Sequence, residues 1–167
     1  VQLSDARGLQ DPTHTQTGEI GFADLDLTDQ HTVTVAPQDG GYRGTMSADV
    51  DVAATGTGVG TIAWNFTVDD AAIDDLTQDQ VLSQSYDVTI DDGQGGSVTE
   101  TVTITLNGSN DVPVANFDTA DADENGAAID IDILANDTDA DSDDDAASLS
   151  VVSATAASGA TVSFTGA

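Results

Sequence analysis

Carboxylates dominate the side chains of this sequence that could do chemistry. The chain has 31 acidic residues against two basic ones, which gives a formal net charge of −29 at pH 7. Only Glu19, Glu100 and Glu124 are glutamates, so almost all of the acids are aspartates. Aspartate tolerates the backbone angles of turns and holds its carboxylate close to the main chain, as the ligands of a calcium loop do. The bias predicts metal-binding loops, with a salt-adapted acidic surface as the alternative.

The residue types that are scarce exclude other kinds of chemistry. The sequence has no cysteine, hence no disulfide or zinc–thiolate site, and its only histidines are His14 and His31. Soft metals are disfavoured for the same reason, and magnesium requires a stricter octahedral geometry than flexible aspartate loops provide. We therefore expect Ca²⁺ as the cofactor. No pattern marks a carboxyl group with a raised pKa in a cleft, so an enzyme is not expected.

Short alternating segments must position these acids. Apolar and β-branched residues alternate with polar ones between Gly-rich turns, and no amphipathic helix of ordinary length is present. The pattern predicts an all-β fold of sandwich type, with Trp64 in the core, a helical turn within 69–76 and a hairpin turn at 91–96. The first unit should hold about seven strands, of which the clearest are 18–22, 31–35, 42–51, 59–68, 81–90 and 97–106.

Pro113 marks the expected boundary between two domains. Proline fixes its own φ, lacks an N–H and pushes the preceding residue towards an extended conformation. We therefore expect one domain at 1–112, with a polar lead-in, and a second at 113–167. The second offers only about four short strands, near 114–117, 129–134, 149–154 and 161–164, which is half a sandwich. Its remaining strands are expected beyond Ala167 or from elsewhere.

Strand order predicts which acids meet. Successive loops of a sandwich alternate between its two ends, so acids from distant parts of the chain can gather at one joint around Pro113. The predicted metal ligands at this joint are Asp24, Asp26, Asp69, Asp70, Asn110, Asp111, Asp137, Asp139 and Asp141. We place Asp91 and Asp92 at the opposite end, where they bind calcium or shape the turn. The acids at 121–124 lie away from the joint, and those at 143–145 are interpreted as solvated surface.

The charge also restricts the partners. There is no basic patch to meet phosphate, so nucleic acid and anionic membranes are not expected to bind. No apolar run approaches the length of a membrane span and no signal peptide is evident, so direct membrane insertion is not expected. We expect a monomer whose partners are neighbouring domains of the same long chain.

Several segments resemble the VCBS repeat, which occurs in giant bacterial surface adhesins of the RTX type. They are TGEIGFADLD (17–26), WNFTVDDAAI (64–73), YDVTIDDGQGG (86–96) and NDVPVA (110–115). The run ILANDTDAD (133–141) resembles the start of a bacterial cadherin-like repeat. The resemblance implies tandem immunoglobulin-like or cadherin-like β-sandwiches with calcium between them. It also implies export by type I secretion and an extracellular location on the bacterial surface.

Residue chemistry and resemblance together favour a calcium-rigidified spacer in a cell-surface adhesin, acting in adhesion or biofilm formation. The alternative is a calcium-dependent module that binds a ligand such as a glycan through the loops of the first unit. Glycan grooves usually expose aromatic rings, and only 4% of the residues are aromatic. An enzyme is the weakest of the three hypotheses.

Overall fold

A computed structural model describes residues 13–121, 123, 126–144 and 148–153 of the chain. The chain divides into two compact units, residues 1–109 (unit 1) and 110–167 (unit 2). Residues 110–112, which were expected in the first domain, thus belong with the second unit. The lead-in was expected at 1–17, but residues 13–17 form the start of the first strand. Residues 1–12, Glu124, Asp145 and the strand expected at 161–164 lie outside the described residues.

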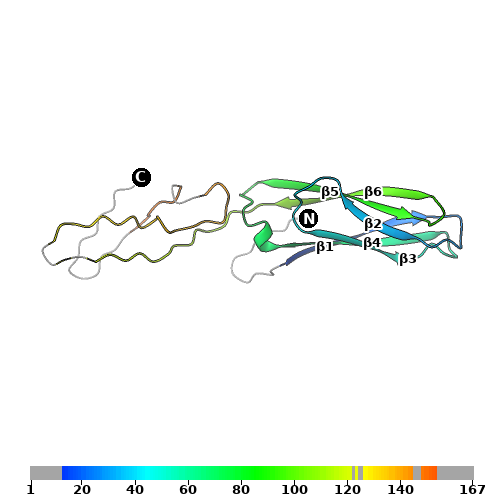
Figure 1. The fold of residues 1–167 in the computed structure, drawn as a ribbon, viewed down its shortest axis with the longest axis horizontal. Helices are drawn as coiled ribbons and strands as arrows, with labels where there is room; N and C mark the ends of the chain where they lie inside the picture. The colour runs from blue at the N-terminus through cyan, green and yellow to red at the C-terminus, as the bar shows by residue number, and fades with distance from the viewer. Residues whose placement is uncertain (1–12, 122, 124–125, 145–147, 154–167) are drawn as a thin grey trace. The chain divides into compact units, whose positions relative to one another are not determined.

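Unit 1 is built from two three-stranded antiparallel sheets (Figure 1). One sheet has the strand order β1-β4-β3 and the other β2-β5-β6. The strands are β1 (Thr13–Ala23), β2 (Thr32–Pro37), β3 (Thr45–Val52), β4 (Val59–Asp69), β5 (Val81–Asp91) and β6 (Ser97–Asn107). The only helical element in the described part of the chain is the 3₁₀ turn η1 (Asp70–Ala72). The prediction of an all-β fold is confirmed at this level.

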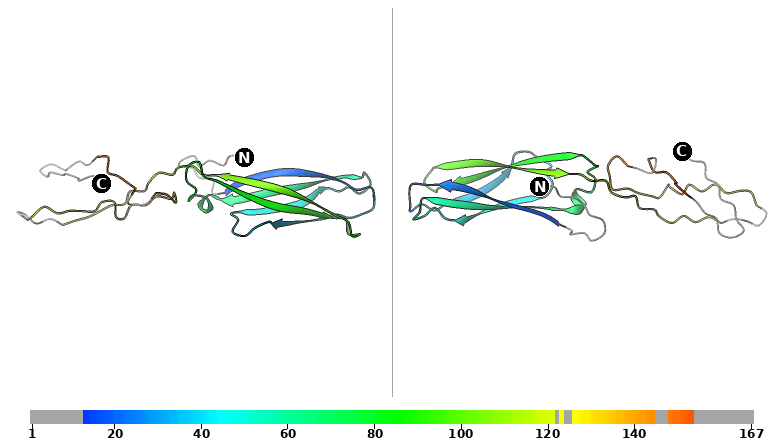
Figure 2. Two further views of the ribbon diagram at one scale, coloured as in Figure 1. Left: turned by 90° about the horizontal axis from the view of Figure 1, so that it is seen from above. Right: turned by 180° about the vertical axis from the view of Figure 1, so that it is seen from behind.

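The buried faces of the two sheets share one apolar core. Figure 2 shows the sheets as two layers, and alternate residues of each strand point between them, as the period of a strand requires. The buried core side chains come from β3 to β6 and the segment after η1: Met46, Ile62, Phe66, Val68, Leu76, Tyr86, Val88, Ile90, Ile104 and Leu106. The alternation of apolar and polar residues in the sequence follows from this one-sided burial.

Trp64 packs against this core but is only partly buried. It pairs with Gly18 on β1, and a Cβ atom at Gly18 would lie 2.3 Å from the indole ring. Glycine is needed at this position because the ring occupies the space of a side chain. Trp64 thus packs on the core, as predicted, and also fills the space that Gly18 leaves on β1.

All six strands of unit 1 run back and forth between two ends. We call the end that holds Thr13, Asp69 and Asn107 the base, and the end that holds Ala23 and Ser97 the tip. The described residues of unit 1 form six strands, where about seven were expected. With this even number, β1 begins and β6 ends at the base.

A polar network joins the β2–β3 connection to the segment after η1. The Arg43 guanidinium donates hydrogen bonds to both oxygens of the Asp75 carboxylate and to the Ala72 carbonyl. The Arg43 hydrogen bond is the main reason that the pKa of Asp75 lies below its usual value. The Gln84 side chain, fully buried, bonds the main-chain N–H and C=O of Arg43. Together these contacts fix the base side of the core.

Unit 2 has far less regular structure. Its described residues contain one isolated antiparallel bridge, between Val114 and Thr138. The strands expected at 114–117 and 129–134 are absent, as is the described part, 149–153, of the strand expected at 149–154. Ile129, Ile131 and Ile133 are 46%, 48% and 37% exposed. The sequence does alternate there, but a strand is stable only when a neighbour accepts its hydrogen bonds and covers its apolar face. Residues 129–133 pair with no described strand, and their isoleucines are covered only in part. No described helix is long and apolar enough to cross a membrane.

Candidate metal centre

Three aspartates of unit 2 gather in one loop. One carboxylate oxygen each of Asp139, Asp141 and Asp144 lies within 4.8 Å of the other two. Oxygens that share a calcium ion at about 2.3–2.6 Å can be at most roughly 5 Å apart. The cluster therefore has the dimensions of a calcium site.

The central aspartate is buried and only half satisfied. Asp141 is 3% exposed, and its Oδ2 accepts a hydrogen bond of 2.8 Å from the Asp111 main-chain N–H. Its Oδ1 is buried and finds no hydrogen-bond partner in the described structure. An unpaired buried carboxylate oxygen costs several kcal/mol unless a charge of opposite sign compensates it. A bound cation would supply that compensation.

Local hydrogen bonds bring the three carboxylates together. The Asp141 N–H donates to Asp139 Oδ1 at 3.1 Å, and the Asp144 N–H donates to the Asp141 carbonyl at 3.2 Å. Thr138, next to the cluster, pairs with Val114 through two main-chain hydrogen bonds of 2.8 and 3.2 Å. These bonds turn the chain back on itself so that the first, third and sixth residues of 139–144 meet.

The donors fit calcium. All three side chains offer carboxylate oxygen, the ligand that hard cations prefer, and the loop has no imidazole or thiol to attract a softer metal. Asp139, Asp141 and Asp144 would hold the ion. Calcium would supply two positive charges where three carboxylates crowd together and would bind the unpartnered Asp141 Oδ1.

The structure gives the remaining ligands predicted in this part of the chain other contacts. Asp111 meets Asp141 through its main-chain N–H. Asp137 Oδ1 accepts a hydrogen bond of 2.8 Å from the Asn116 N–H, so it fixes the 114–116 segment. The Asn110 side-chain amide donates to the Asp111 carbonyl.

Asp144 was missed, because the run 143–145 was interpreted as solvated surface. For the exposed Asp143 the structure agrees with that interpretation. The signal that would have identified Asp144 is its spacing from Asp139 and Asp141. A tight turn from Asp141 to Asp144 returns the later carboxylate to the earlier two.

Asp69 and Asp70 lie at the base of unit 1 and are engaged within it. Asp70 Oδ1 lies 2.7 Å from Nε2 of His14, and Asp69 Oδ1 accepts a hydrogen bond of 3.0 Å from the Thr13 hydroxyl. The predicted helical turn is present as η1, but Asp69 occupies its N-cap without making a side-chain cap bond. Cross-strand pairing with β1 has replaced capping for both carboxylates.

Asp24 and Asp26 do not lie where they were predicted. They follow β1 at the tip, whereas Asp69 ends β4 and Asp70 follows it at the base. The 11 residues of β1 separate these positions, which corresponds to roughly 33 Å at the rise of an extended strand. The prediction that the two pairs share one end is wrong. Loops three strands apart in an up-and-down order lie at opposite ends.

Asp24 instead forms a second acidic cluster at the tip with Asp29 and Asp92, whose oxygens lie within 4.8 Å of one another. Asp24 Oδ2 lies 2.9 Å from Nε2 of His31, and Asp24 Oδ1 accepts the Asp26 N–H at 2.8 Å. Asp92 Oδ1 accepts hydrogen bonds from two N–H groups of its own turn, 2.7 and 2.9 Å long. These bonds lower the pKa of Asp92. Asp92 therefore shapes the β5–β6 turn.

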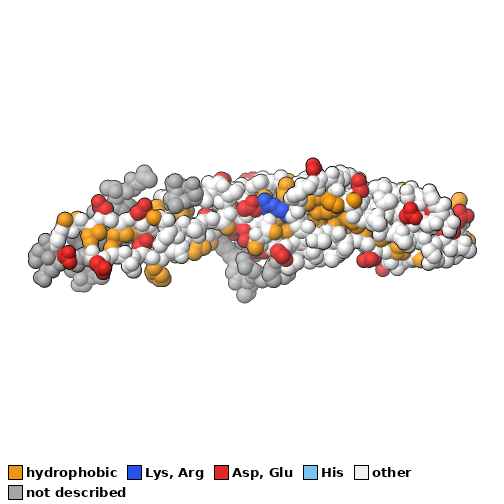
Figure 3. Space-filling view, viewed as in Figure 1, with side chains coloured by type: hydrophobic (Ala, Val, Ile, Leu, Met, Phe, Trp, Pro, Cys, Tyr) orange, Lys and Arg blue, Asp and Glu red, His pale blue; other side chains and the backbone are white. Residues whose placement is uncertain are grey.

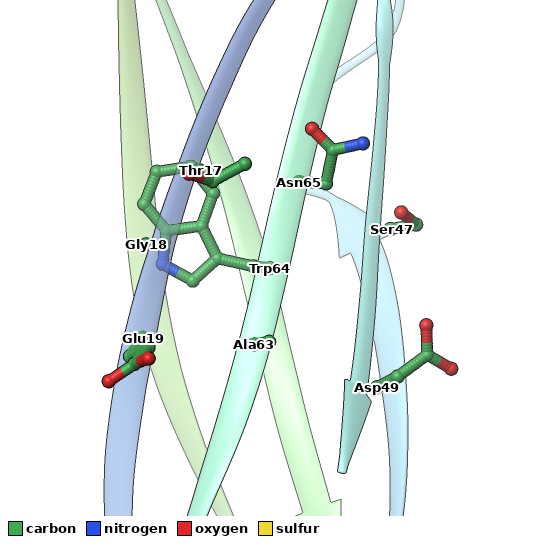
Figure 4. A pocket seen from close by; sticks show the side chains of 8 residues that line it. All are labelled: Thr17, Gly18, Glu19, Ser47, Asp49, Ala63, Trp64 and Asn65. Carbon is green, nitrogen blue, oxygen red and sulfur yellow. The ribbon is translucent and has the colours of Figure 1, made fainter. Parts of the chain in front are cut away.

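A polar groove crosses the outer face of the β1-β4-β3 sheet (Figure 4). Ala63 lies between Glu19 and Asp49, which pair with it from the two neighbouring strands. Trp64 also borders the groove, but its indole lies against Gly18 and packs on the core. Stacking on a sugar would require the ring to leave this packing, so the groove does not favour the glycan alternative.

No protein-family model matches this sequence, and no curated protein matches it. The functional argument therefore rests on the chemistry of the clusters and on the way the fold positions them.

Proposed function

We propose that this chain belongs to a calcium-stabilised spacer region of a bacterial cell-surface adhesin and acts in adhesion or biofilm formation. The proposal includes tandem immunoglobulin-like or cadherin-like β-sandwiches, export by type I secretion and an extracellular location. The single observation that carries it is the buried Asp141, whose Oδ1 is unpartnered within a triad of carboxylates.

Electrostatics explains why calcium would matter here. Two carboxylates about 4.8 Å apart repel by about 1 kcal/mol in water and by more where water is excluded. The triad contains three such pairs. A bound calcium ion replaces this repulsion with attraction, and the Asp111–Asp141 hydrogen bond ties the loop to the first residues of unit 2. Calcium should therefore order unit 2 and stiffen the connection that leads into it.

The fold and surface of unit 1 support the same role. Two antiparallel sheets around a common core are the construction expected of an immunoglobulin-like sandwich. Acidic side chains are spread over the face shown in Figure 3. An acidic surface keeps long extracellular chains soluble and apart.

A calcium titration followed by thermal unfolding and small-angle X-ray scattering tests the proposal. Calcium should raise the unfolding temperature and narrow the distribution of molecular dimensions. Half-saturation is expected at about 10⁻⁴ to 10⁻³ M, the range of extracellular modules. Magnesium at the same concentration is the control and should have a much smaller effect. If saturating calcium changes neither measurement, the spacer proposal fails.

A further inference from the structure

Three turns form the tip of unit 1: β1–β2 (residues 24–31), β3–β4 (53–58) and β5–β6 (92–96). β1 begins and β6 ends at the base, so no connection to the rest of the described chain passes through the tip (Figure 1, right-hand end). Ends of this kind, built from turns on a rigid scaffold, are common places for binding surfaces.

Hydrogen bonds hold the β1–β2 and β3–β4 turns against each other. The Gly56 N–H donates to the Leu27 carbonyl at 2.8 Å, and the Thr55 hydroxyl donates to the Asp29 carbonyl at 3.0 Å. Gly56 has φ +81°, which glycine adopts without strain. A partner would therefore meet a preformed surface, which reduces the entropy lost on binding.

Exposed apolar side chains gather on this surface. Leu25 is 92% exposed and Leu27 47%, and both project from the β1–β2 turn. Val52 and Val59, at the tip ends of β3 and β4, are 50% and 59% exposed. Together these four residues are the tip apolar patch. Apolar side chains grouped in this way mark interaction sites.

A shallow groove on the outer face of the β1-β4-β3 sheet is lined by the two valines of the patch. Val52 and Val59 border it, and the small residues Gly21 and Ala23 of β1 leave space between them. A Cβ atom at Gly21 would meet no other atom within 4 Å. The groove can therefore accept an apolar side chain from outside.

Aspartates flank the two leucines of the patch in the β1–β2 turn. Asp24 and Asp26 alternate with the two leucines in sequence, and Asp29 and Asp92 complete the cluster. Desolvation and the neighbouring Asp24, Asp26 and Asp92 raise the pKa of Asp29, which a nearby positive charge would reverse. Asp24 and Asp92 already accept hydrogen bonds within the tip. This use of their oxygens favours an organic cation at the rim over a metal ion.

We propose that the tip of unit 1 is a docking surface for a cationic, apolar segment of another protein. Apolar side chains of the partner enter the groove between Val52 and Val59 and cover Leu25, while its lysine or arginine groups face the tip aspartates. Charge complementarity selects such a partner. The proposal does not rest on the calcium centre of unit 2.

Binding of a fluorescent peptide in which leucine alternates with lysine tests this docking surface. The full chain is titrated in EDTA, so that metal plays no part, and anisotropy reports binding. The double variant Leu25→Ser, Val59→Ser should bind about tenfold more weakly, because two apolar contacts are lost. The matched control Val81→Ser, also 59% exposed but at the base, should bind like the parent chain.

A peptide of lysine alone separates docking from charge attraction. It should bind weakly, and equally to the parent chain and both variants. Equal affinity of the two peptides, or an equal loss in both variants, would overturn the proposal in favour of non-specific charge attraction. Amide chemical-shift mapping on the parent chain provides a test that needs no variant. Shifts must concentrate in 24–31 and 52–59, and shifts spread over the whole unit would also overturn it.

Discussion

Replacing Asp141 with asparagine should change the stability of unit 2 differently in the absence and in the presence of calcium. Asparagine keeps the size of the side chain and an oxygen to accept the Asp111 N–H. It removes one charge from the triad and hence two of its three repulsive pairs, each about 1 kcal/mol in water. Without calcium, the variant should therefore be as stable as the parent chain or up to roughly 2 kcal/mol more stable.

With calcium the parent chain should gain much more stability than the variant. At about 10 mM calcium, about one hundred times a Kd near 10⁻⁴ M, binding stabilises the parent unit by about 2.7 kcal/mol. Losing a buried anionic ligand weakens the free energy of calcium binding by about 2 to 5 kcal/mol. The variant should then gain at most about 0.9 kcal/mol from the same calcium, which is at least about 1.8 kcal/mol less than the parent unit gains.

Hydrogen exchange followed by mass spectrometry measures the stability of unit 2 apart from that of unit 1, with and without calcium. Peptides covering 110–144 should exchange more slowly when calcium is added to the parent chain. In Asp141→Asn, calcium should leave their exchange rates almost unchanged. The control is Asp143→Asn, which removes the same charge from an exposed carboxylate of the same loop. It should keep the full calcium effect. If Asp141→Asn gains as much protection as the parent chain, or Asp143→Asn loses it equally, the assignment of the centre is refuted.

Two further predictions concern unit 1. Gly44→Ala should destabilise the fold by more than about 2 kcal/mol, because Gly44 has φ +81° and a Cβ there would lie 2.4 Å from the Thr67 carbonyl oxygen. Gly40→Ala, where a Cβ meets no other atom within 4 Å, should be nearly neutral in the same urea titration. Arg43→Ala should cost roughly 0.5 to 1 kcal/mol at neutral pH, since Asp75 is partly solvated. Because the folded pKa of Asp75 is lowered, this stability is present above its unfolded pKa of about 3.9 and is lost as pH falls through the folded value. Equal destabilisation by Arg43→Ala at neutral pH and at about pH 2 would show that packing, and not the ion pair, is responsible.

Local patterns predicted much of unit 1. Alternation from Val59 to Val68 and the Gly-rich turn at 91–96 gave the strands and the hairpin, because side-chain period and turn chemistry are local properties. The position of Asp24 could not be predicted in the same way. It depends on how many strands separate two loops, and a difference of one strand moves a carboxylate to the other end of the unit.

In unit 2, sequence reasoning selected Asp139 and Asp141 but not Asp144. The turn that brings Asp144 back is held by a main-chain hydrogen bond to Asp141, and only the spacing of the aspartates signals it in the sequence. The alternating isoleucines at 129–133 show the opposite failure. They encode a face that requires cover, but not which element covers it.

The arrangement of β1 and β6 also determines how unit 1 should respond to mechanical load. Both Thr13 and Asn107 lie at the base, and β1 and β6 are edge strands of different sheets. Tension applied at these two points pulls each strand away from its neighbour at one end, so hydrogen bonds break one after another instead of sharing the load in shear. We expect unit 1 to peel open at low force in single-molecule pulling, with the tip separating last. A single high-force rupture would contradict this geometry.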